Sequence, residues 1–385
     1  MHSKHNPGGN VTIVGASLSG LYCAYLLAKE GVAVDVYDQT VRDAHYHERT
    51  LIVTSEFRNV VLMDHSLWVL NSIHSFTLHS NTEEVHLALR HPDLIIERRR
   101  SLKLLEEAAL NHGAKIHRGY RFTGYVPTRD GMYVEFLNRR TGGVHRVKTQ
   151  VLIGANGAHS DVAQAIGLDS RPTVQLIQAK VALPPNHDPH RVDIWFDVEI
   201  TPYFLWLIPE SETEGVFGLI AADGRSAKPA LDKFISRLHL KPKSYQRGQV
   251  ALYSPGIAPW RQVGSARVLL VGDAAGHVKV TTVGGTVTGF AGANAAVRSV
   301  LRGTDYEKEL RPLRRELFLH YLIRKALDGF RNRDYDELLR SLNGGAISIL
   351  QKHSRDRMFP VFWRLFLAQV RLVKPALISL WRAIV

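Results

Sequence analysis

The chain has 385 residues, enough for two or three structural units, with 45% hydrophobic and 22% charged residues. This composition is that of a folded globular protein, so it excludes a disordered chain, a fibrous protein and a small disulfide-stapled domain. The one cysteine, Cys23, excludes an internal disulfide and a cysteine-rich zinc site, and we therefore expect a cytoplasmic protein.

The net charge is +13, and residues 301–385 hold 17 basic and 9 acidic side chains. A basic chain can bind nucleic acid, but we find neither zinc-finger spacing nor interleaved basic and aromatic residues, so we expect no nucleic-acid partner. No uncharged apolar stretch reaches the length of about 18 residues that a membrane span needs. We also expect no targeting peptide.

The first residues predict a strand–helix–strand unit. Val11–Val14 is a β-branched run, a turn of small residues follows, and good helix formers occupy Leu21–Lys29. Gly31 ends this helix, and Val32–Tyr37 predicts the second strand. The unit is typical of a parallel sheet with a crossover helix.

The pattern continues with alternating strands and helices. Leu94–Ile96 predicts the end of a strand, Ser101–Asn111 a helix, and the region of Lys115 and Ile116 another strand. Alternation between Tyr120 and Val151 predicts hairpins, and Val151–Ile153 predicts a buried strand.

Short strands broken by prolines between Arg171 and Pro255 indicate a second, sheet-rich domain, after which Val268–Val271 predicts another buried strand. We therefore predict an α/β fold, α+β overall. Its discontinuous Rossmann-type domain covers residues 1–170 and 256–304, its sheet-rich substrate domain residues 171–255, and its helical C-terminal region residues 305–385.

A glycine motif follows the first predicted strand. Gly15 and Gly20 frame this turn, with Ser17 where a dinucleotide fingerprint has its middle glycine, and Asp38 ends the next strand. Glycines at the ends of such a turn allow a tight bend and close packing of helix on strand, and the open helix N-terminus offers amide donors to a pyrophosphate. An ordinary strand-to-helix turn is the alternative interpretation.

Two further glycine turns follow predicted strands. One runs from Gly154 through Asn156 and Gly157 to Ser160. The other begins Gly272-Asp273-Ala-Ala-Gly276-His277 and continues to Gly284 and Gly285, which open a helix of small residues. Three such turns, one ending in an acid, indicate a fold that binds a long dinucleotide.

In order and spacing, these motifs resemble those of the flavoprotein oxidoreductases of the p-hydroxybenzoate hydroxylase structural class. The resemblance covers about residues 10–300, and Gly272–Ala296 is most similar to the geranylgeranyl reductase branch. Ile95–Arg98 resembles the family segment with an arginine at the FAD phosphates, and Phe204–Pro209 resembles the YxWxFP element of the substrate pocket.

The resemblance implies a set of residues that bind FAD. The first motif, Asp38 and Arg98 would hold the ADP half, Asp273 the ribityl chain, and Gly284 and Gly285 the pyrimidine edge of the ring. The full set is Gly15, Ala16, Ser17, Leu18, Ser19, Gly20, Asp38, Arg98, Gly272, Asp273, Gly284 and Gly285.

Several positions depart from the family pattern. Asn156 replaces a usual aspartate, Val280 a usual proline and Phe204 a usual tyrosine, and Ala163 stands where an arginine often follows. Cys23 lies in the first helix rather than near the flavin, so the sequence gives no support for a cysteine-assisted mechanism.

No catalytic residue is identified, but Trp206, His277 and Arg49 are pocket candidates. Their alternatives are a core aromatic, a solvated loop histidine and a surface arginine. We expect Trp195, Phe196, Phe204 and Trp206 to provide an apolar pocket. We expect no metal site, because the 19 histidines, His45 and His47 among them, lack ligand spacing.

The resemblance implies an FAD-dependent oxidoreductase that reduces C=C bonds of a prenyl chain or lipid, with NADPH or a ferredoxin as reductant. Alternatives are a flavin-dependent monooxygenase or halogenase, suggested by Trp206, Ile208 and Pro209, and a non-catalytic flavin-binding or prenyl-lipid-binding protein. Aromatic and basic residues in Met358–Val385 predict peripheral contact with the inner face of a membrane, or else a helix packed on the protein itself.

Overall fold

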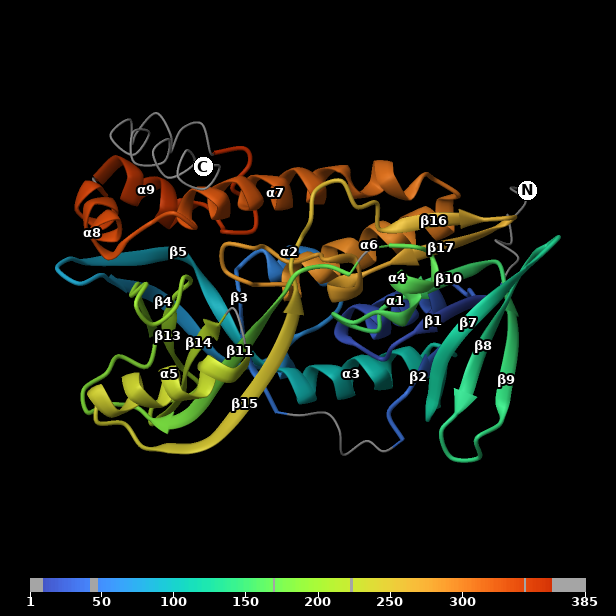
Figure 1. Cartoon of the computed structure of the whole chain (residues 1–385), viewed down its shortest axis with the longest axis horizontal. Helices are drawn as coiled ribbons and strands as arrows, with labels where there is room; N and C mark the ends of the chain where they lie inside the picture. Colours follow the sequence, from blue (N-terminus) through green and yellow to red (C-terminus); the bar gives the residue numbers. More distant parts are fainter. Residues whose placement is uncertain (1–9, 42–47, 169, 222–223, 343, 362–385) are drawn as a thin grey trace.

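The computed structural model describes residues 10–41, 48–168, 170–221, 224–342 and 344–361. Two large sheets lie at opposite ends of the long axis, and the C-terminal helices run along one side of both (Figure 1). This mixed α/β architecture, with a Rossmann-type domain and a sheet-rich region, is the one that the sequence predicts.

A six-stranded sheet forms the centre of the first domain. The strand order is β16-β17-β10-β1-β2-β6; β16 and β17 are antiparallel and the other neighbours parallel. The strands are β1 (Val11–Val14), β2 (Val34–Asp38), β6 (Lys115–Arg118), β10 (Val151–Gly154), β16 (Trp260–Val263) and β17 (Ala266–Leu270). The domain is therefore built from distant parts of the chain.

Both faces of this sheet are covered, because successive side chains of a strand point to opposite faces. Val11 and Ile13 pack with helices α1 (Leu18–Lys29), α3 (Arg98–Asn111) and α6 (Thr286–Arg302). Val14 and Leu152 pack toward the small sheet of β7 (Tyr120–Thr128), β8 (Gly131–Asn138) and β9 (Val144–Thr149), and toward α4 (Asp161–Ala165). The βαβ unit and the hairpins thus occur where the sequence predicts them.

The second sheet has eight strands in the order β15-β11-β14-β13-β12-β4-β5-β3. They are β3 (Thr50–Val53), β4 (Val69–His79), β5 (Glu84–Glu97), β11 (Thr173–Ala182), β12 (Arg191–Trp195), β13 (Leu205–Pro209), β14 (Glu214–Ala221) and β15 (Pro242–Ala251). Strands β3, β4 and β5 come from the part of the chain that the sequence assigned to the first domain, yet they pair in this sheet. The boundaries at residues 170, 255 and 304 remain a prediction.

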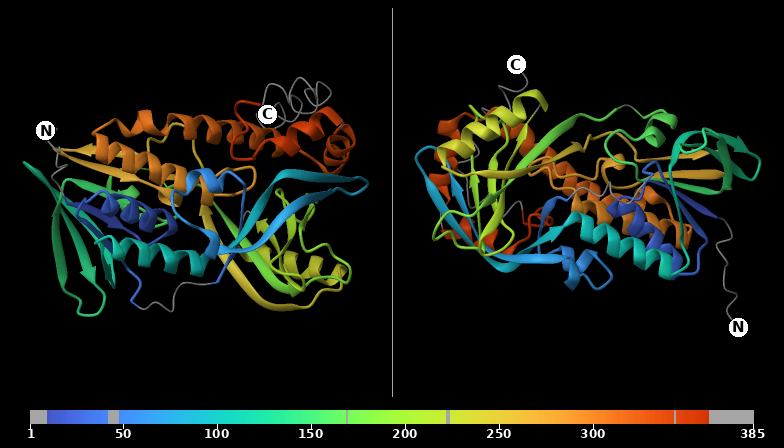
Figure 2. Two further views of the ribbon diagram at one scale, coloured as in Figure 1. Left: turned by 180° about the vertical axis from the view of Figure 1, so that it is seen from behind. Right: turned by 90° about the horizontal axis from the view of Figure 1, so that it is seen from below.

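Helices cover the second sheet and join it to the first domain. Helix α5 (Gly224–Arg237), which the sequence pattern did not predict, packs on one face of the sheet. The C-terminal helices lie along the molecule (Figure 2). They are α7 (Tyr306–Leu327), α8 (Asn332–Ser341) and α9 (Gly344–Lys352). The short helices are α2 (Phe57–Val60), η2 (Ser66–Trp68) and η3 (Gly272–Ala275).

Within the residues that the structure describes, no helix has the length and apolar character needed to cross a membrane. The segment predicted to contact a membrane begins at Met358, but residues 362–385 lie outside the described part of the chain.

Candidate functional site

The turn after β1 requires both of its glycines. Gly15 has φ +106°, and a Cβ there would lie 2.5 Å from the carbonyl oxygen of Ala155. A Cβ on Gly20 would collide with the carbonyl of Gly15 and lie 2.9 Å from the Ala155 side chain. The first two turns therefore meet at Ala155, and side chains larger than hydrogen at Gly15 or Gly20 would separate them.

The two serines of the first motif have different structural roles. Ser17 caps α1, because its Oγ accepts a hydrogen bond of 3.2 Å from the amide of Gly20. Ser19 is buried, with its Oγ in the space that side chains at Gly272 or Gly289 would need. The Ser19 side chain thus packs the first helix against the third motif.

Asp38 is fixed at the end of β2, next to the first turn. Its Oδ2 accepts a 2.8 Å hydrogen bond from the amide of Ala16, and its Oδ1 accepts another from Thr40. A carboxylate oxygen has more than one acceptor site, so Asp38 can also accept from a ribose hydroxyl. This is the place where a dinucleotide fold presents such an acid.

In the second motif, Asn156 has a partner inside the motif itself. Ser160 Oγ donates a 2.5 Å hydrogen bond to Asn156 Oδ1, and also accepts from the amide of Ala163. The amide that replaces the family's usual aspartate therefore stabilises the turn into α4. Ala163, where the family often has arginine, lies within that short helix.

The third motif brings Asp273 near two arginines. Burial raises the pKa of Asp273, whereas the charges of Arg49 and Arg98 lower it. Burial and the charge of Arg98 lower the pKa of Arg49, Asp273 opposes both, and the result is a pKa of about 10. Asp273 therefore lies in a desolvated region under the electrostatic influence of two guanidinium groups.

An orphaned atom at Arg49 indicates what this region can bind. The Nε of Arg49 is buried and has no hydrogen-bond partner among the described residues. A buried donor without a partner is costly, and an anionic group beside two arginines would relieve that cost. Arg49 therefore offers a buried donor to a bound group and is not a surface arginine, while the contact of Arg98 with the FAD phosphates remains a prediction.

The glycines at the start of α6 lie beside Asp273. Gly285 precedes Thr286, the first residue of α6, and a Cβ on it would lie 3.4 Å from Asp273 Oδ1 and 2.9 Å from Val278. Asp273 and Gly285, which are 12 residues apart in the chain, therefore form one surface. Bare backbone at this helix N-terminus can approach an electron-rich ring edge closely.

These observations form one site, because β1, β10 and β17 are neighbouring parallel strands whose carboxyl ends carry the three turns. That edge of an open α/β sheet is where nucleotides bind. The residues present therefore fit FAD, with donors for the phosphates, an acid for the ribose and a glycine-lined helix start for the ring. The individual cofactor contacts remain predictions.

Trp206 lies on the face of the second sheet that meets the first domain. Its Nε1 donates a 3.2 Å hydrogen bond to Gln178 Oε1, and its ring covers Gly218, where a Cβ would be 2.6 Å from the indole. The sequence pattern did not identify Gln178, because the strands β11 and β13 are brought together only by the fold. Trp206 belongs to an apolar cluster that includes Val278 and Val283 of the third motif.

The expectation that Trp195 shares a pocket with Trp206 is wrong. Trp195 is opposite Leu205 in the sheet register, and both belong to the cluster beneath α5, on the other face. The cause is the two-residue period of a strand, because Trp206 and Leu205 are adjacent and point to opposite faces. Phe204 does lie near Trp206, with ring centroids 5.9 Å apart.

His277 is not a solvated loop residue. It is 2% exposed, and its ring occupies the space above Gly292 in α6, so that a side chain at Gly292 would collide with it. Both ring nitrogens lack a hydrogen-bond partner among the described residues. Burial, together with the charges of Arg171 and Arg314, lowers the pKa of His277 to about 3.

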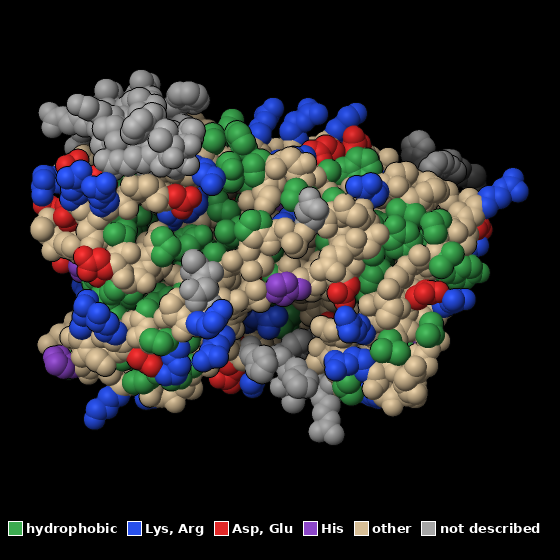
Figure 3. Space-filling view, viewed as in Figure 1, with side chains coloured by type: hydrophobic (Ala, Val, Ile, Leu, Met, Phe, Trp, Pro, Cys, Tyr) green, Lys and Arg blue, Asp and Glu red, His purple; other side chains and the backbone are tan. Residues whose placement is uncertain are grey.

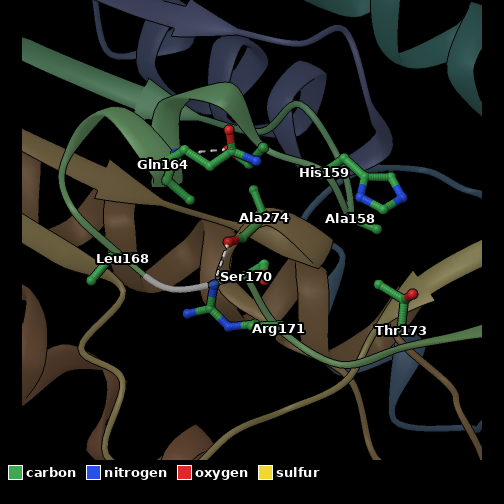
Figure 4. Close-up of a pocket in the computed structure, with 10 residues that line it drawn as sticks. Ala158, His159, Gln164, Leu168, Ser170, Arg171, Thr173 and Ala274 are labelled. Atoms are coloured by element: carbon green, nitrogen blue, oxygen red, sulfur yellow. Dashed lines mark hydrogen bonds between the residues drawn. The ribbon is translucent and has the colours of Figure 1, made fainter.

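A cavity of about 290 Å³ lies on the outer side of the second motif (Figure 4). Its lining includes His159, Ser160, Gln164 and Arg171, and Arg171 donates a 3.0 Å hydrogen bond to the carbonyl of Ala274. Arg171 precedes β11 and therefore links the start of that strand to the turn that carries Asp273. No motif in the sequence marks this arginine, because its partner lies about 100 residues further along the chain.

The described residues include many histidine, lysine and arginine side chains, and their arrangement bears on metal binding and on the surface charge. No group of three or more histidine, cysteine, aspartate or glutamate side chains that could hold a metal ion occurs within the described ranges, which omit His45 and His47. On the face drawn in Figure 3, lysine and arginine side chains are spread among other residues.

The amino-acid sequence is similar to one protein family and to a known reductase. Residues 9–225 match the family described as FAD binding domain. The chain is 28% identical over 285 residues to digeranylgeranylglycerophospholipid reductase 2 of Methanothermobacter thermautotrophicus, which covers 69% of this chain and 72% of that protein.

Solved structures share the fold over most of the chain. A geranylgeranyl bacteriochlorophyll reductase-like protein of Thermoplasma acidophilum superimposes with a TM-score of 0.75 at 16% identity, covering 96% of this chain and 99% of that one. A flavin-dependent halogenase superimposes with a TM-score of 0.69 at 16% identity, covering 95% and 77%. At these identities the likeness concerns the fold alone.

Proposed function

This chain belongs to the FAD binding domain family. We propose that it is an FAD-dependent reductase that acts on C=C bonds in a geranylgeranyl-type prenyl chain or lipid. The proposal follows the sequence similarity to the digeranylgeranylglycerophospholipid reductase, which extends over more than two thirds of both chains. We propose Gly15–Gly20, Asp38, Arg98, Gly272, Asp273, Gly284 and Gly285 as the cofactor-binding residues.

The observation that carries this proposal is the double role of the third motif. Asp273 and Gly285 line the proposed cofactor site, whereas Val278 and Val283, from the same loop, pack into the apolar cluster of Trp206. A hydrocarbon chain bound along that cluster would therefore extend to the position that we propose for the flavin ring. An apolar wall is what a prenyl substrate needs.

Once reduced by an external donor, bound FAD would supply a hydride to one carbon of the double bond, and a pocket acid or water would supply the proton to the other. Asp273 would accept a hydrogen bond from the ribityl chain, and the backbone at Gly284 and Gly285 would face the ring. Trp206 and its neighbours orient the substrate and exclude water. His277 is buried against α6 and kept neutral, so we assign it to packing rather than to proton transfer.

The alternative function is oxygenation or halogenation on the same fold. It draws on the structural likeness to a halogenase and on Trp206, Ile208 and Pro209 in β13. In both reactions the cofactor site is the same, so geometry does not separate them. The products separate them, because a reductase adds hydrogen to the double bond, whereas a monooxygenase or halogenase consumes oxygen and adds an oxygen atom or a halogen.

The deciding experiment is chemical. The reduced flavoprotein is incubated with geranylgeranyl lipids, with and without oxygen, and the products are weighed by mass spectrometry. Gain of hydrogen pairs in the absence of oxygen supports the reductase, whereas gain of an oxygen atom or a halide only in air contradicts it. Parallel reactions with NADPH and with reduced ferredoxin identify the reductant. Protein that neither carries nor takes up FAD would favour a non-catalytic lipid carrier.

Binding to a membrane surface is part of the same proposal, since a prenyl lipid resides in a membrane. Truncation before Met358 removes the aromatic and basic segment. Reduced binding to anionic liposomes supports surface contact through this segment, and unchanged binding contradicts it.

A further inference from the structure

The loop Lys279–Gly285 has a strained backbone. Val283 has φ +50°, a left-handed conformation that β-branched residues rarely adopt. The loop is closed by a backbone hydrogen bond of 3.2 Å from the amide of Lys279 to the carbonyl of Gly284. Strain of this kind persists only where surrounding contacts fix the conformation, and it concentrates at ligand sites.

A buried ion pair fixes one end of the loop. Lys279 Nζ lies 2.5 Å from Asp356 Oδ1, and the two side chains are 6% and 2% exposed. Thr54, just after β3, donates a 2.6 Å hydrogen bond to the other carboxylate oxygen of Asp356. The loop is therefore tied both to the C-terminal segment and to the second sheet.

A second contact fixes the middle of the loop. His320 in α7 pairs through Nδ1 with the Thr281 hydroxyl at 2.6 Å and through Nε2 with the carbonyl of Arg355 at 3.1 Å. A carbonyl can only accept, so Nε2 donates to Arg355, and in the neutral ring Nδ1 accepts from Thr281. The segment Ser354–Phe359 is thus linked to the loop twice, directly through Asp356 and Lys279 and indirectly through His320.

The segment Ser354–Phe359 is itself held in place. Glu316 in α7 accepts hydrogen bonds from the amides of Met358 and Phe359, at 2.6 and 2.9 Å. Arg355 pairs with the buried Asp93 of β5 at 2.5 Å. These contacts make the segment a rigid brace, anchored on a helix and on the second sheet.

We propose that Lys279 and Asp356 are positioning residues for the flavin: through the brace Ser354–Phe359 they hold the strained loop in the conformation that presents Gly284 and Gly285 to the cofactor ring. The inference rests on the proposed cofactor site and extends it, because it assigns the C-terminal segment a role in cofactor binding. Neither residue touches the flavin in this proposal. They act through the backbone at Val283.

The test uses a neutral replacement of the pair, Lys279→Met with Asp356→Asn, in the full chain. Replacing both partners avoids an unpaired buried charge, so the variant is expected to fold. The loop then relaxes, and FAD titration of the apoprotein should give a dissociation constant raised about tenfold, with a shifted flavin midpoint potential. The backbone amide of residue 279, which donates to the carbonyl of Gly284, should exchange hydrogen faster in the apoprotein.

Two further variants separate positioning from general stability. Asp193 in β12 of the second sheet is another buried carboxylate, 6% exposed and paired with His187. Asp193→Asn removes this carboxylate and should leave FAD affinity unchanged. Val283→Gly, added to the double variant, removes the strain and should restore most of the lost affinity. Affinity of the double variant within twofold of the wild type, or no rescue by glycine, would overturn the inference. A wild-type chain that binds no FAD would instead overturn the proposed cofactor site.

Discussion

Asp38 Oδ2 and the amide of Ala16 form a 2.8 Å hydrogen bond that joins the end of the second strand to the turn after the first. The bond holds in place a turn in which all six residues from Gly15 to Gly20 are proposed to contact the cofactor. It also limits how far the turn can move when one of its glycines changes. The first prediction tests this rigidity.

Gly20→Val should abolish FAD retention. A Cβ at this position would collide with the backbone carbonyl of Gly15, so α1 would have to move away from β1. We expect a loss of roughly 1–3 kcal/mol of stability from overpacking, in addition to the loss of cofactor. The measurement is the flavin content of the purified protein.

Gly124→Val is the matched control for this change. Gly124 in β7 has open space around its α-carbon, and valine suits a strand. This variant should keep its flavin. A fully flavinated Gly20→Val protein would contradict the assignment of the first motif.

Asp273→Ala should weaken FAD binding more than His159→Ala. Asp273, in η3, lies beside Gly285 at the start of α6, whereas His159 is exposed on the second turn. Loss of a hydrogen bond to a charged group is worth about 1.5–3 kcal/mol, so the dissociation constant should rise about tenfold to a hundredfold. Fluorescence titration with FAD measures both variants, and equal affinities would refute the role of Asp273.

The three turns could be predicted from sequence because their geometry is local. A glycine after a β-branched run is required by the bend itself, as at Gly15, and needs no knowledge of the rest of the fold. The start of α3 at Arg98 rather than Ser101 has a local cause as well: Glu97 accepts hydrogen bonds from the amides of Arg99 and Arg100.

The apolar face and the brace could not be predicted, because they depend on contacts between distant segments. Strand β4 pairs with β12, and Lys279 with Asp356, across stretches of chain that carry no joint signal. Trp195 was assigned to the wrong face because no strand boundary fixed its register relative to Trp206. Alternation determines which residues share a face only when the strand is known.

The pKa of His277 makes a prediction about acid stability. Its folded pKa is lowered to about 3 from an ordinary 6.5, so between these values the unfolded chain binds a proton that the folded protein does not. Stability should therefore fall as the pH drops below 6.5, by up to about 1.4 kcal/mol per pH unit from this group.

His277→Gln removes the titrating group and should reduce this slope. Urea denaturation of the apoprotein at several pH values between 7 and 4 provides the measurement, with His159→Gln as the exposed control. The slope of the control should equal that of the wild type. If His277→Gln has the wild-type slope too, His277 is not the group responsible.

Gly218→Ala should impair substrate turnover while sparing the cofactor. The new methyl group would meet the indole of Trp206 and the Cβ of Gln178, each at 2.6 Å, in a strand where neither neighbour can withdraw without breaking their mutual hydrogen bond. Trp206 must therefore tilt into the apolar cluster where we place the prenyl chain. We expect kcat/KM for a geranylgeranyl lipid to fall about tenfold or more, with FAD affinity within twofold of the wild type.

Trp206→Phe, which leaves room for the methyl group, should recover part of the activity when combined with Gly218→Ala. Wild-type turnover in Gly218→Ala would mean that the substrate does not lie against Trp206.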